Sequence, residues 1–204
     1  MTDVLPQHLI TLHPDAQAQL FTAAHTANTF TDQPVTDEQL HAIHDLVKYP
    51  PTAMNTQPLR VLYTRPGPAR DRLLTHLADG NRAKTATAPV VAVLAADTTF
   101  HDHLPTTFPI RPGLRDHFAT DDTAREHTAR FNATIQIGYY LLGVRAAGLA
   151  VGPMGGFDPA GVDRDFFTDT GWTSLLVVNI GHPGPDAHFP RLPRLDHTDT
   201  IRHA

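Results

Sequence analysis

The sequence contains no cysteine and a single serine. Without cysteine the chain has no disulfide, no thiolate nucleophile and no iron–sulfur ligation. It therefore suits a reducing compartment such as the cytoplasm, and any redox chemistry must come from a bound cofactor. The serine, Ser174, falls in a segment that is expected to form a buried strand. This placement excludes a Ser-His-Asp hydrolase.

Positive charge and long apolar runs are also scarce. Lys and Arg number 16 against 21 Asp and Glu, and the formal net charge is -5. The basic residues are scattered, without a stripe that could follow a phosphate backbone. The longest apolar run, 88–96, is far shorter than the roughly 20 residues of a membrane span, and the N-terminus lacks a signal-peptide pattern. We therefore expect a cytoplasmic protein with no nucleic-acid or membrane partner.

Histidine is abundant, with 14 residues, and raises the question of a metal site. The candidate ligand pairs are His41-x-x-His44 in a predicted helix and His101-x-His103 in a predicted loop. Zinc sites normally use three or four protein ligands, and neither pair has a third ligand at a recognisable spacing. We expect no metal centre.

A chain of 204 residues with 41% hydrophobic content can bury a core as one compact domain or as half of an intertwined dimer. We treat 1–204 as one domain. Thr36 and Gln39 form a capping-box pattern that begins a helix, and Pro50 and Pro51 end it. Continuous apolar runs predict strands that are buried on both faces. The expected helices are 15–30, 36–48, 69–77, 121–147 and 159–167, and the expected strands are 60–63, 88–96, 149–154 and 173–180.

Three segments stand out from this pattern. Residues 98–119 are rich in proline and histidine and have little periodicity, which indicates a long irregular excursion used as a lid or a partner arm. The proline-rich tail 182–195 cannot build its own core, so it must lie extended across another surface. Residues 131–147 are apolar nearly all round, which places this part of the long helix in a core or a subunit interface.

The most informative stretch is the loop 50–60, Pro-Pro-Thr-Ala-Met-Asn-Thr-Gln-Pro-Leu-Arg. Its prolines bracket the polar side chains of Thr52, Asn55, Thr56 and Gln57 between a predicted helix and a predicted strand. The loop is either a ligand-facing polar loop or a capped connection between the two elements.

Five segments in order resemble the nitroreductase family of FMN enzymes, and the closest resemblance is to its malonic semialdehyde reductase subgroup. The resemblance covers about residues 20–196. The segments are Thr26-Ala-Asn-Thr-Phe30, the loop Pro51-Thr-x-x-Asn-x-Gln-Pro58, Asn81-Arg-Ala-Lys84, Gly152-Pro-Met-Gly-Gly-Phe-Asp158 and Arg191-Leu-Pro-Arg-Leu195. The resemblance implies an α+β fold, with a central mainly antiparallel sheet surrounded by helices. It also implies an intertwined homodimer, with helix 131–147 at the interface and two FMN molecules between the subunits.

The resemblance also assigns roles to individual residues. Lys84 is implied to sit near the flavin N1 and O2, where a fixed ammonium stabilises the negative charge that reduction leaves at N1. The backbone of Gly155 and Gly156 is implied to face the flavin N5 edge, where a side chain would block the reactants. The implied cofactor-binding residues are His25, Thr26, Asn28, Pro51, Thr52, Asn55, Gln57, Asn81, Lys84, Pro153, Met154, Gly155, Gly156, Arg191 and Arg194.

The phosphate end departs from the family pattern. Arg191 and Arg194 are implied to bind the FMN phosphate, which a guanidinium fork fits well, and Thr26 is implied to supply a hydroxyl. The family usually has an arginine just before that Thr or Ser, whereas this chain has His25. Asn28 stands where many members have a second basic residue.

The implied reaction is a ping-pong transfer of hydride from NADPH or NADH through flavin N5 to a small acceptor. By the closest resemblance the acceptor is a 3-oxo acid such as malonic semialdehyde. A quinone, a nitroarene or a natural-product tailoring substrate fits the same fold. The alternative of another class is a non-catalytic binding or scaffold protein with impaired FMN binding, which the substitutions at His25 and Asn28 favour.

Overall fold

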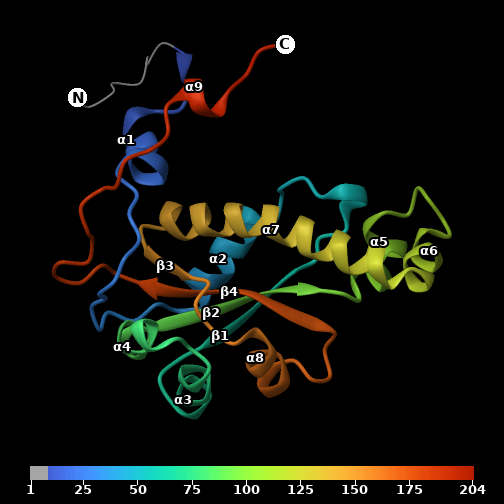
Figure 1. Ribbon diagram of the computed structural model, residues 1–204, viewed down its shortest axis with the longest axis horizontal. Helices are drawn as coiled ribbons and strands as arrows, with labels where there is room; N and C mark the ends of the chain where they lie inside the picture. Colours follow the sequence, from blue (N-terminus) through green and yellow to red (C-terminus); the bar gives the residue numbers. More distant parts are fainter. Residues whose placement is uncertain (1–8) are drawn as a thin grey trace.

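The computed structural model describes residues 9–204, and its centre is a four-stranded sheet. The strands are β1 (Leu59–Thr64), β2 (Val90–Asp97), β3 (Ala150–Met154) and β4 (Trp172–Gly181). Their order is β1-β2-β4-β3, and every neighbouring pair is antiparallel (Figure 1). The predicted α+β fold with a mainly antiparallel sheet is confirmed.

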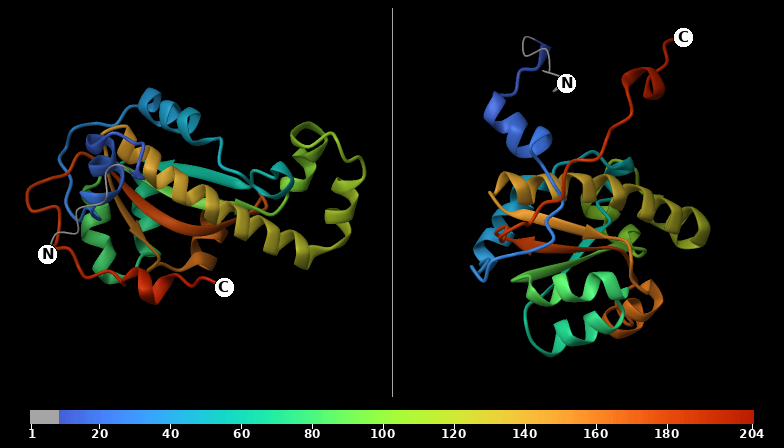
Figure 2. Two further views of the ribbon diagram at one scale, coloured as in Figure 1. Left: turned by 90° about the horizontal axis from the view of Figure 1, so that it is seen from above. Right: turned by 60° about the vertical axis from the view of Figure 1, so that its left-hand side comes forward.

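Helices cover both faces of this sheet (Figures 1 and 2). The 25-residue α7 (Asp122–Ala146) and α2 (Asp37–Val47) cover one face. The other face carries α3 (Pro68–Thr75), α4 (Asp79–Thr87) and α8 (Pro159–Phe166). Alternate residues of β2 point into two separate core clusters, and all eight of its residues are buried. The strand is therefore buried on both faces, as its continuous apolar run predicts.

The signals for helix termini also hold in the structure. At the start of α2 the Thr36 hydroxyl accepts from the amide of Gln39 at 3.2 Å, and the Gln39 side chain accepts from the amide of Thr36 at 2.9 Å. Asp121 caps α7 by accepting from the amide of Ala124 at 2.9 Å. Gly148 follows α7 with φ of +77°, a conformation that glycine adopts without strain.

The prediction of an irregular excursion at 98–119 is wrong. The segment contains a 3-10 turn (Phe100–His103), α5 (Leu104–Thr107) and α6 (Leu114–Thr120). Pro105 lies in the first turn of α5, where a missing amide proton is tolerated. The segment forms a third core with the first half of α7, and its buried members are Ala96, Phe100, Leu104, Leu114, Phe118, Ala129 and Ala133.

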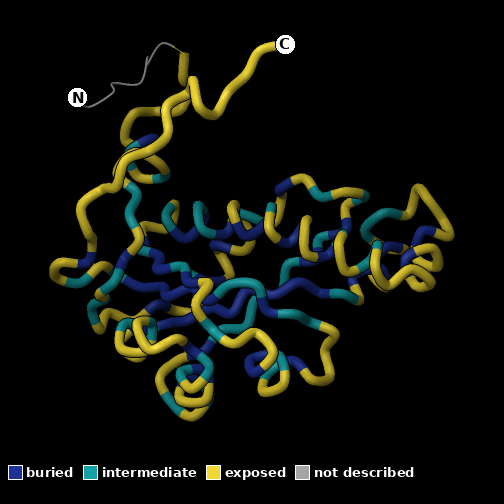
Figure 3. Tube along the Cα trace, in the orientation of Figure 1, coloured by how far each residue is buried: buried dark blue, intermediate teal, exposed yellow. Residues whose placement is uncertain are grey.

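The segments at both ends of the described chain contain little regular secondary structure. The helix predicted at 15–30 is only α1 (Pro14–Gln17) followed by a π-helical turn (Ala18–Thr22), and an irregular segment then leads to α2. The tail beyond β4 is extended and mostly exposed, and carries the short α9 (His197–Thr200) (Figure 3). The tail and the N-terminal segment lie side by side (Figures 1 and 2).

Helix α7 is only half-covered in the single chain. One side packs into the sheet with buried Ile137, Tyr140 and Val144, whereas Phe131 is 60% exposed and Tyr139 is 44% exposed. The expectation that 131–147 is buried all round therefore does not hold within one chain. No helix within 9–204 has the length and apolar character that a membrane span requires.

Candidate functional site

The loop between α2 and β1 has an unusual backbone. A short 3-10 turn, Ala53–Asn55, lies within it, and Met54, Asn55 and Gln57 have φ of 53°, 51° and 43°. Non-glycine residues rarely adopt this left-handed region, and each such residue costs about 1–3 kcal/mol. Such a conformation persists only where the surroundings fix it.

Two buried amide side chains of α7 fix this loop. The carbonyl oxygen of Asn132 accepts from the amide of Ala53 at 2.7 Å, and that of Gln136 accepts from the amide of Leu59 at 2.9 Å. Because the two amides are four residues apart, they lie on the same side of the helix. They hold the two ends of the loop. The side chain of Asn55 adds a third tie, by donating to the carbonyl of Thr107 at 2.7 Å.

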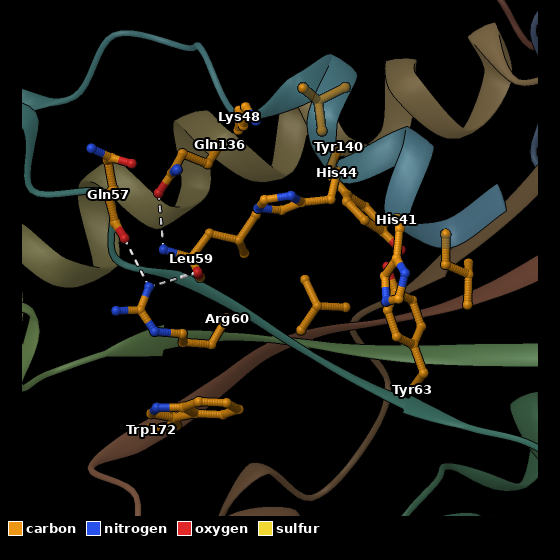
Figure 4. Close-up of a pocket in the computed structure, with 13 residues that line it drawn as sticks. His41, His44, Lys48, Gln57, Leu59, Arg60, Tyr63, Gln136, Tyr140 and Trp172 are labelled. Atoms are coloured by element: carbon orange, nitrogen blue, oxygen red, sulfur yellow. Dashed lines mark hydrogen bonds between the residues drawn. The ribbon is translucent and has the colours of Figure 1, made fainter. Parts of the chain in front are cut away.

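Arg60 closes the loop at its C-terminal end (Figure 4). One guanidinium nitrogen donates to the carbonyls of Gln57 and Leu59, both at 2.9 Å, and another contacts the Asp97 carboxylate at 2.6 Å. The Asp97 side chain is only 3% exposed and also accepts from the amide and hydroxyl of Thr99. The arginine is therefore engaged by its own chain and is not free to bind a substrate carboxylate.

A cavity of about 380 Å³ lies beside the loop, between α2, β1 and α7 (Figure 4). The hydroxyl of Tyr140 donates to that of Tyr63 at 3.0 Å on its wall. Gln57 is its only lining residue from the predicted site, and His41 and His44 line it without a third metal ligand. Within 9–204 no group of three or more metal-ligating side chains comes together.

A second part of the predicted site forms where α4 meets the end of β3. The side-chain amide of Asn81 donates to the carbonyl of Gly156 at 2.9 Å. A Cβ atom at Gly156 would lie 2.8 Å from that amide nitrogen, whereas one at Gly155 would meet nothing within 4 Å. Lys84 is half-buried one turn further along α4, and no carboxylate of the described chain pairs with it. Pro153 and Met154 lead directly into the glycine pair.

The third part is a cavity of about 700 Å³ between the N-terminal segment and the tail. Arg191 joins the two segments by donating to the carbonyls of Thr22 and Ala24, both at 2.9 Å. This cavity brings together all of the residues predicted for the phosphate end. They are His25, Thr26, Asn28, Arg191 and Arg194.

Arg145 also lines this cavity, and the sequence reasoning missed it. It lies in the last turn of α7 and donates to the carbonyl of His25 at 3.0 Å. Burial, and then the positive charge of Arg191, lower the pKa of Arg145. In the sequence the residue looks like an ordinary cation that complements the helix dipole, so no local signal points to the cavity. The His188 ring is also near, 5.3 Å from that of His25.

The loop and the 700 Å³ cavity do not meet within a single chain. The loop is tied to Asn132 and the cavity to Arg145, which are 13 residues apart on α7, or roughly 20 Å along the helix axis. The loop with Pro51, Thr52, Asn55 and Gln57 therefore lies beside the middle of α7, and the residues of the 700 Å³ cavity lie at its C-terminal end.

Comparisons with known proteins agree on one family. Residues 22–182 match the sequence model described as "Nitroreductase family". A Streptomyces coelicolor protein with the provisional name NADH dehydrogenase/NAD(P)H nitroreductase is 54% identical over 187 residues, covering 92% of this chain and 93% of its own. A Streptomyces griseus protein of the same provisional name is 55% identical over 192 residues, covering 94% of this chain and 97% of its own.

A solved structure agrees on the fold. It is a provisionally named nitroreductase from Exiguobacterium sibiricum in complex with FMN, and it superposes with a TM-score of 0.80 at 16% identity. The superposition covers 95% of this chain and 99% of that one. At this identity the likeness concerns the fold alone. With the family match over residues 22–182 and two relatives that share more than half of their residues, the chain belongs to the nitroreductase family.

Proposed function

We propose that this protein is an FMN-dependent oxidoreductase that passes hydride from NADH or NADPH to a small acceptor. The observation that carries the proposal is the contact between Asn81 and the Gly156 carbonyl beside the open position at Gly155. It creates a polar edge next to a surface that no side chain covers. The names of the relatives and the FMN complex of the Exiguobacterium protein support the same activity.

The residues present fit FMN. The 700 Å³ cavity offers guanidinium groups of Arg191 and Arg194 and a hydroxyl of Thr26 to a phosphate, and no carboxylate lines it. We assign Asn81 and the Gly156 backbone to the pyrimidine edge and Lys84 to the neighbourhood of N1 and O2. When bound, FMN supplies two-electron redox chemistry, which a chain without cysteine cannot take from its own thiols.

The remaining site residues shape the surroundings of the flavin. We assign Pro153 and Met154 to the support of the glycine pair, and Gly155 to the face where hydride arrives. Lys84 would stabilise negative charge that develops on reduction, because its ammonium is half-buried and unpaired among the described residues. Pro51, Thr52, Asn55 and Gln57 would contact the flavin from their rigid loop.

We propose that two copies complete each site as an intertwined homodimer. The separation of the loop and the 700 Å³ cavity along α7 supports this, because the loop of one copy can then serve the cavity of the other. Exposed apolar groups on α7 also require a cover, and β1 is an edge strand. The tail carries further exposed apolar side chains, at Phe189, Leu192 and Leu195.

For the acceptor we favour a neutral nitroaromatic or quinone-like compound over a 3-oxo acid. Malonic semialdehyde carries a carboxylate, which calls for a free guanidinium. Arg60 is engaged by Asp97, and Arg115 contacts Asp102 at 2.8 Å and Asp116 at 3.2 Å. Arg111 lines a different cavity, which contains none of the predicted site residues. The 3-oxo acid stays a prediction of the sequence resemblance, and a tailoring substrate is the remaining alternative.

The cheapest test is the colour of the purified protein. A yellow protein that bleaches with NADH or NADPH is the expected result, and acceptors can then be compared in single-turnover oxidation of the reduced protein. We expect neutral nitroaromatics or quinones to reoxidise it faster than malonic semialdehyde does. A colourless protein that FMN cannot reconstitute would refute the proposed enzymatic function and favour the alternative of a non-catalytic binding or scaffold protein. Sedimentation of a stable monomer that binds FMN would refute the homodimer.

A further inference from the structure

We propose that Arg145 is a phosphate-binding residue, which supplies from α7 the guanidinium that the chain lacks at His25. The ligand class is a phosphate monoester, and the inference rests on the proposed FMN function. The tail contributes Arg191 and Arg194 to the 700 Å³ cavity, the N-terminal segment contributes polar side chains such as Thr26, and α7 contributes a third wall through Arg145.

The charges in this cavity are unbalanced. Arg145, Arg191 and Arg194 all line it, and no carboxylate within 9–204 forms an ion pair with any of them. Elsewhere in the described chain Arg65, Arg82 and Arg125 each contact an Asp at 3.0 Å or less. Positive charges gathered without a counter-charge repel one another, and the positive charge of Arg191 acts directly on Arg145. A phosphate dianion between them would remove this repulsion.

The hydrogen bonds leave donors for such an anion. A guanidinium carries five N–H groups. Arg145 donates one to the carbonyl of His25, and Arg191 donates from a single nitrogen to the carbonyls of Thr22 and Ala24. The carbonyl bonds fix the direction of both side chains without consuming the other nitrogens. Both arginines are thus pre-oriented, which reduces the entropy lost on binding.

A purely structural role is the competing explanation for Arg145. Its bond to the His25 carbonyl ties the N-terminal segment to α7, and a cation in the last turn is favoured by the helix dipole. The two roles differ in one respect. If Arg145 is only a structural tie, its loss should weaken the binding of FMN and of riboflavin equally. If it binds the phosphate, its loss should weaken only FMN binding, because riboflavin lacks the phosphate.

The experiment measures the affinity of the flavin-free full chain for FMN and for riboflavin by fluorescence titration. For Arg145→Gln we expect FMN binding to weaken by about ten- to a hundredfold, the range of one charge-assisted interaction, with riboflavin binding unchanged. Arg145→Lys keeps the charge but loses the fork, so it should recover part of the FMN affinity. Arg130→Gln is the matched control, since Arg130 is exposed on the same helix and should change neither affinity.

Each result decides the question. An unchanged FMN affinity in Arg145→Gln overturns the inference, and so does an equal loss for both flavins together with a lower melting temperature of the flavin-free protein. Should Arg145→Gln not fold, Arg145→Met, which keeps much of the aliphatic side chain without the charge, takes its place, and an unchanged FMN affinity in that variant would overturn the inference. Wild-type protein that binds neither flavin would overturn the proposed function, and this inference with it. Wild-type binding of FMN with an unaffected Arg145→Gln would overturn the inference alone.

Discussion

The substitution Gly155→Val separates catalysis from folding in this protein. A Cβ at Gly155 meets no atom within 4 Å, and the residue is not in the left-handed region. The valine should therefore leave the fold intact. It should even raise the free energy of unfolding, by about 0.4–1 kcal/mol at most, because the unfolded chain loses freedom.

The neighbouring substitution Gly156→Ala is the matched control, for which we expect no such gain in stability. Its Cβ would lie 2.8 Å from the amide nitrogen of Asn81, which must move away from the Gly156 carbonyl. Loss of that hydrogen bond costs about 0.5–1.5 kcal/mol, which offsets the gain of about 0.4–1 kcal/mol from the reduced freedom of the unfolded chain, so Gly156→Ala should be less stable than Gly155→Val. Urea denaturation of both variants measures the contrast.

The expected effect of Gly155→Val on catalysis is large. Hydride transfer needs the reacting atoms within about 3–3.5 Å, and a displacement of about 1 Å can cost roughly a hundredfold. We expect stopped-flow reduction by NADH or NADPH to slow at least by roughly that factor, while FMN affinity changes little. Reduction at the wild-type rate would mean that hydride does not arrive over Gly155, and the assignment of this face would be wrong.

Three further predictions address other parts of the chain. Lys84→Ala should slow flavin reduction roughly tenfold or more while weakening FMN binding less, because the charge it offsets develops on reduction; equal losses would make Lys84 an anchor only. Asn132→Leu leaves the Ala53 amide unpaired and should lower the unfolding free energy by about 1–3 kcal/mol in urea titrations, and an unchanged value would show that the loop holds itself. Burial lowers the pKa of His101, so its contribution to stability is complete above the unfolded pKa near ~6.5 and is lost as pH falls. His101→Gln should therefore make the melting temperature depend less on pH between about pH 7 and about pH 5. Equal slopes of melting temperature against pH in wild type and variant would contradict this.

Local signals in the sequence were enough to predict the four strands and the start of α2. Thr36 and Gln39 satisfy each other's backbone amides, and this depends on residues only three apart. Residues 90–96 of β2 are apolar without alternation, which indicates a strand that is covered on both sides. Asn81 and Gly156 meet in space, but each was identified through a family motif rather than through its own neighbours.

The signals that failed depend on residues far apart in the chain. The short helices in 98–119 are held by Phe100 and Phe118 against Ala129 and Ala133 of α7, and a periodicity count within the segment cannot show this packing. In the sequence Arg145 is simply an arginine at the end of a helix, and only the fold shows that it contacts the N-terminal segment. Residues 131–147 of α7 were predicted to be buried on every side, whereas one side is exposed in the single chain. An apolar composition indicates that a surface is covered, but it does not tell whether the same chain or a partner covers it.

Helix α7 links the two halves of the proposed site. Its first half holds the strained loop through Asn132 and Gln136, and its last turn reaches the phosphate cavity through Arg145. Between them Gly143 faces Val47 of α2 so closely that a Cβ would collide with the valine side chain. The backbone of α7 therefore sits directly on α2, and α2 runs into the loop. Because a packed helix moves as a rigid body, its position sets the loop and the cavity together. In a homodimer, where the loop of one copy serves the cavity of the other, the same helix would then fix the geometry of both sites.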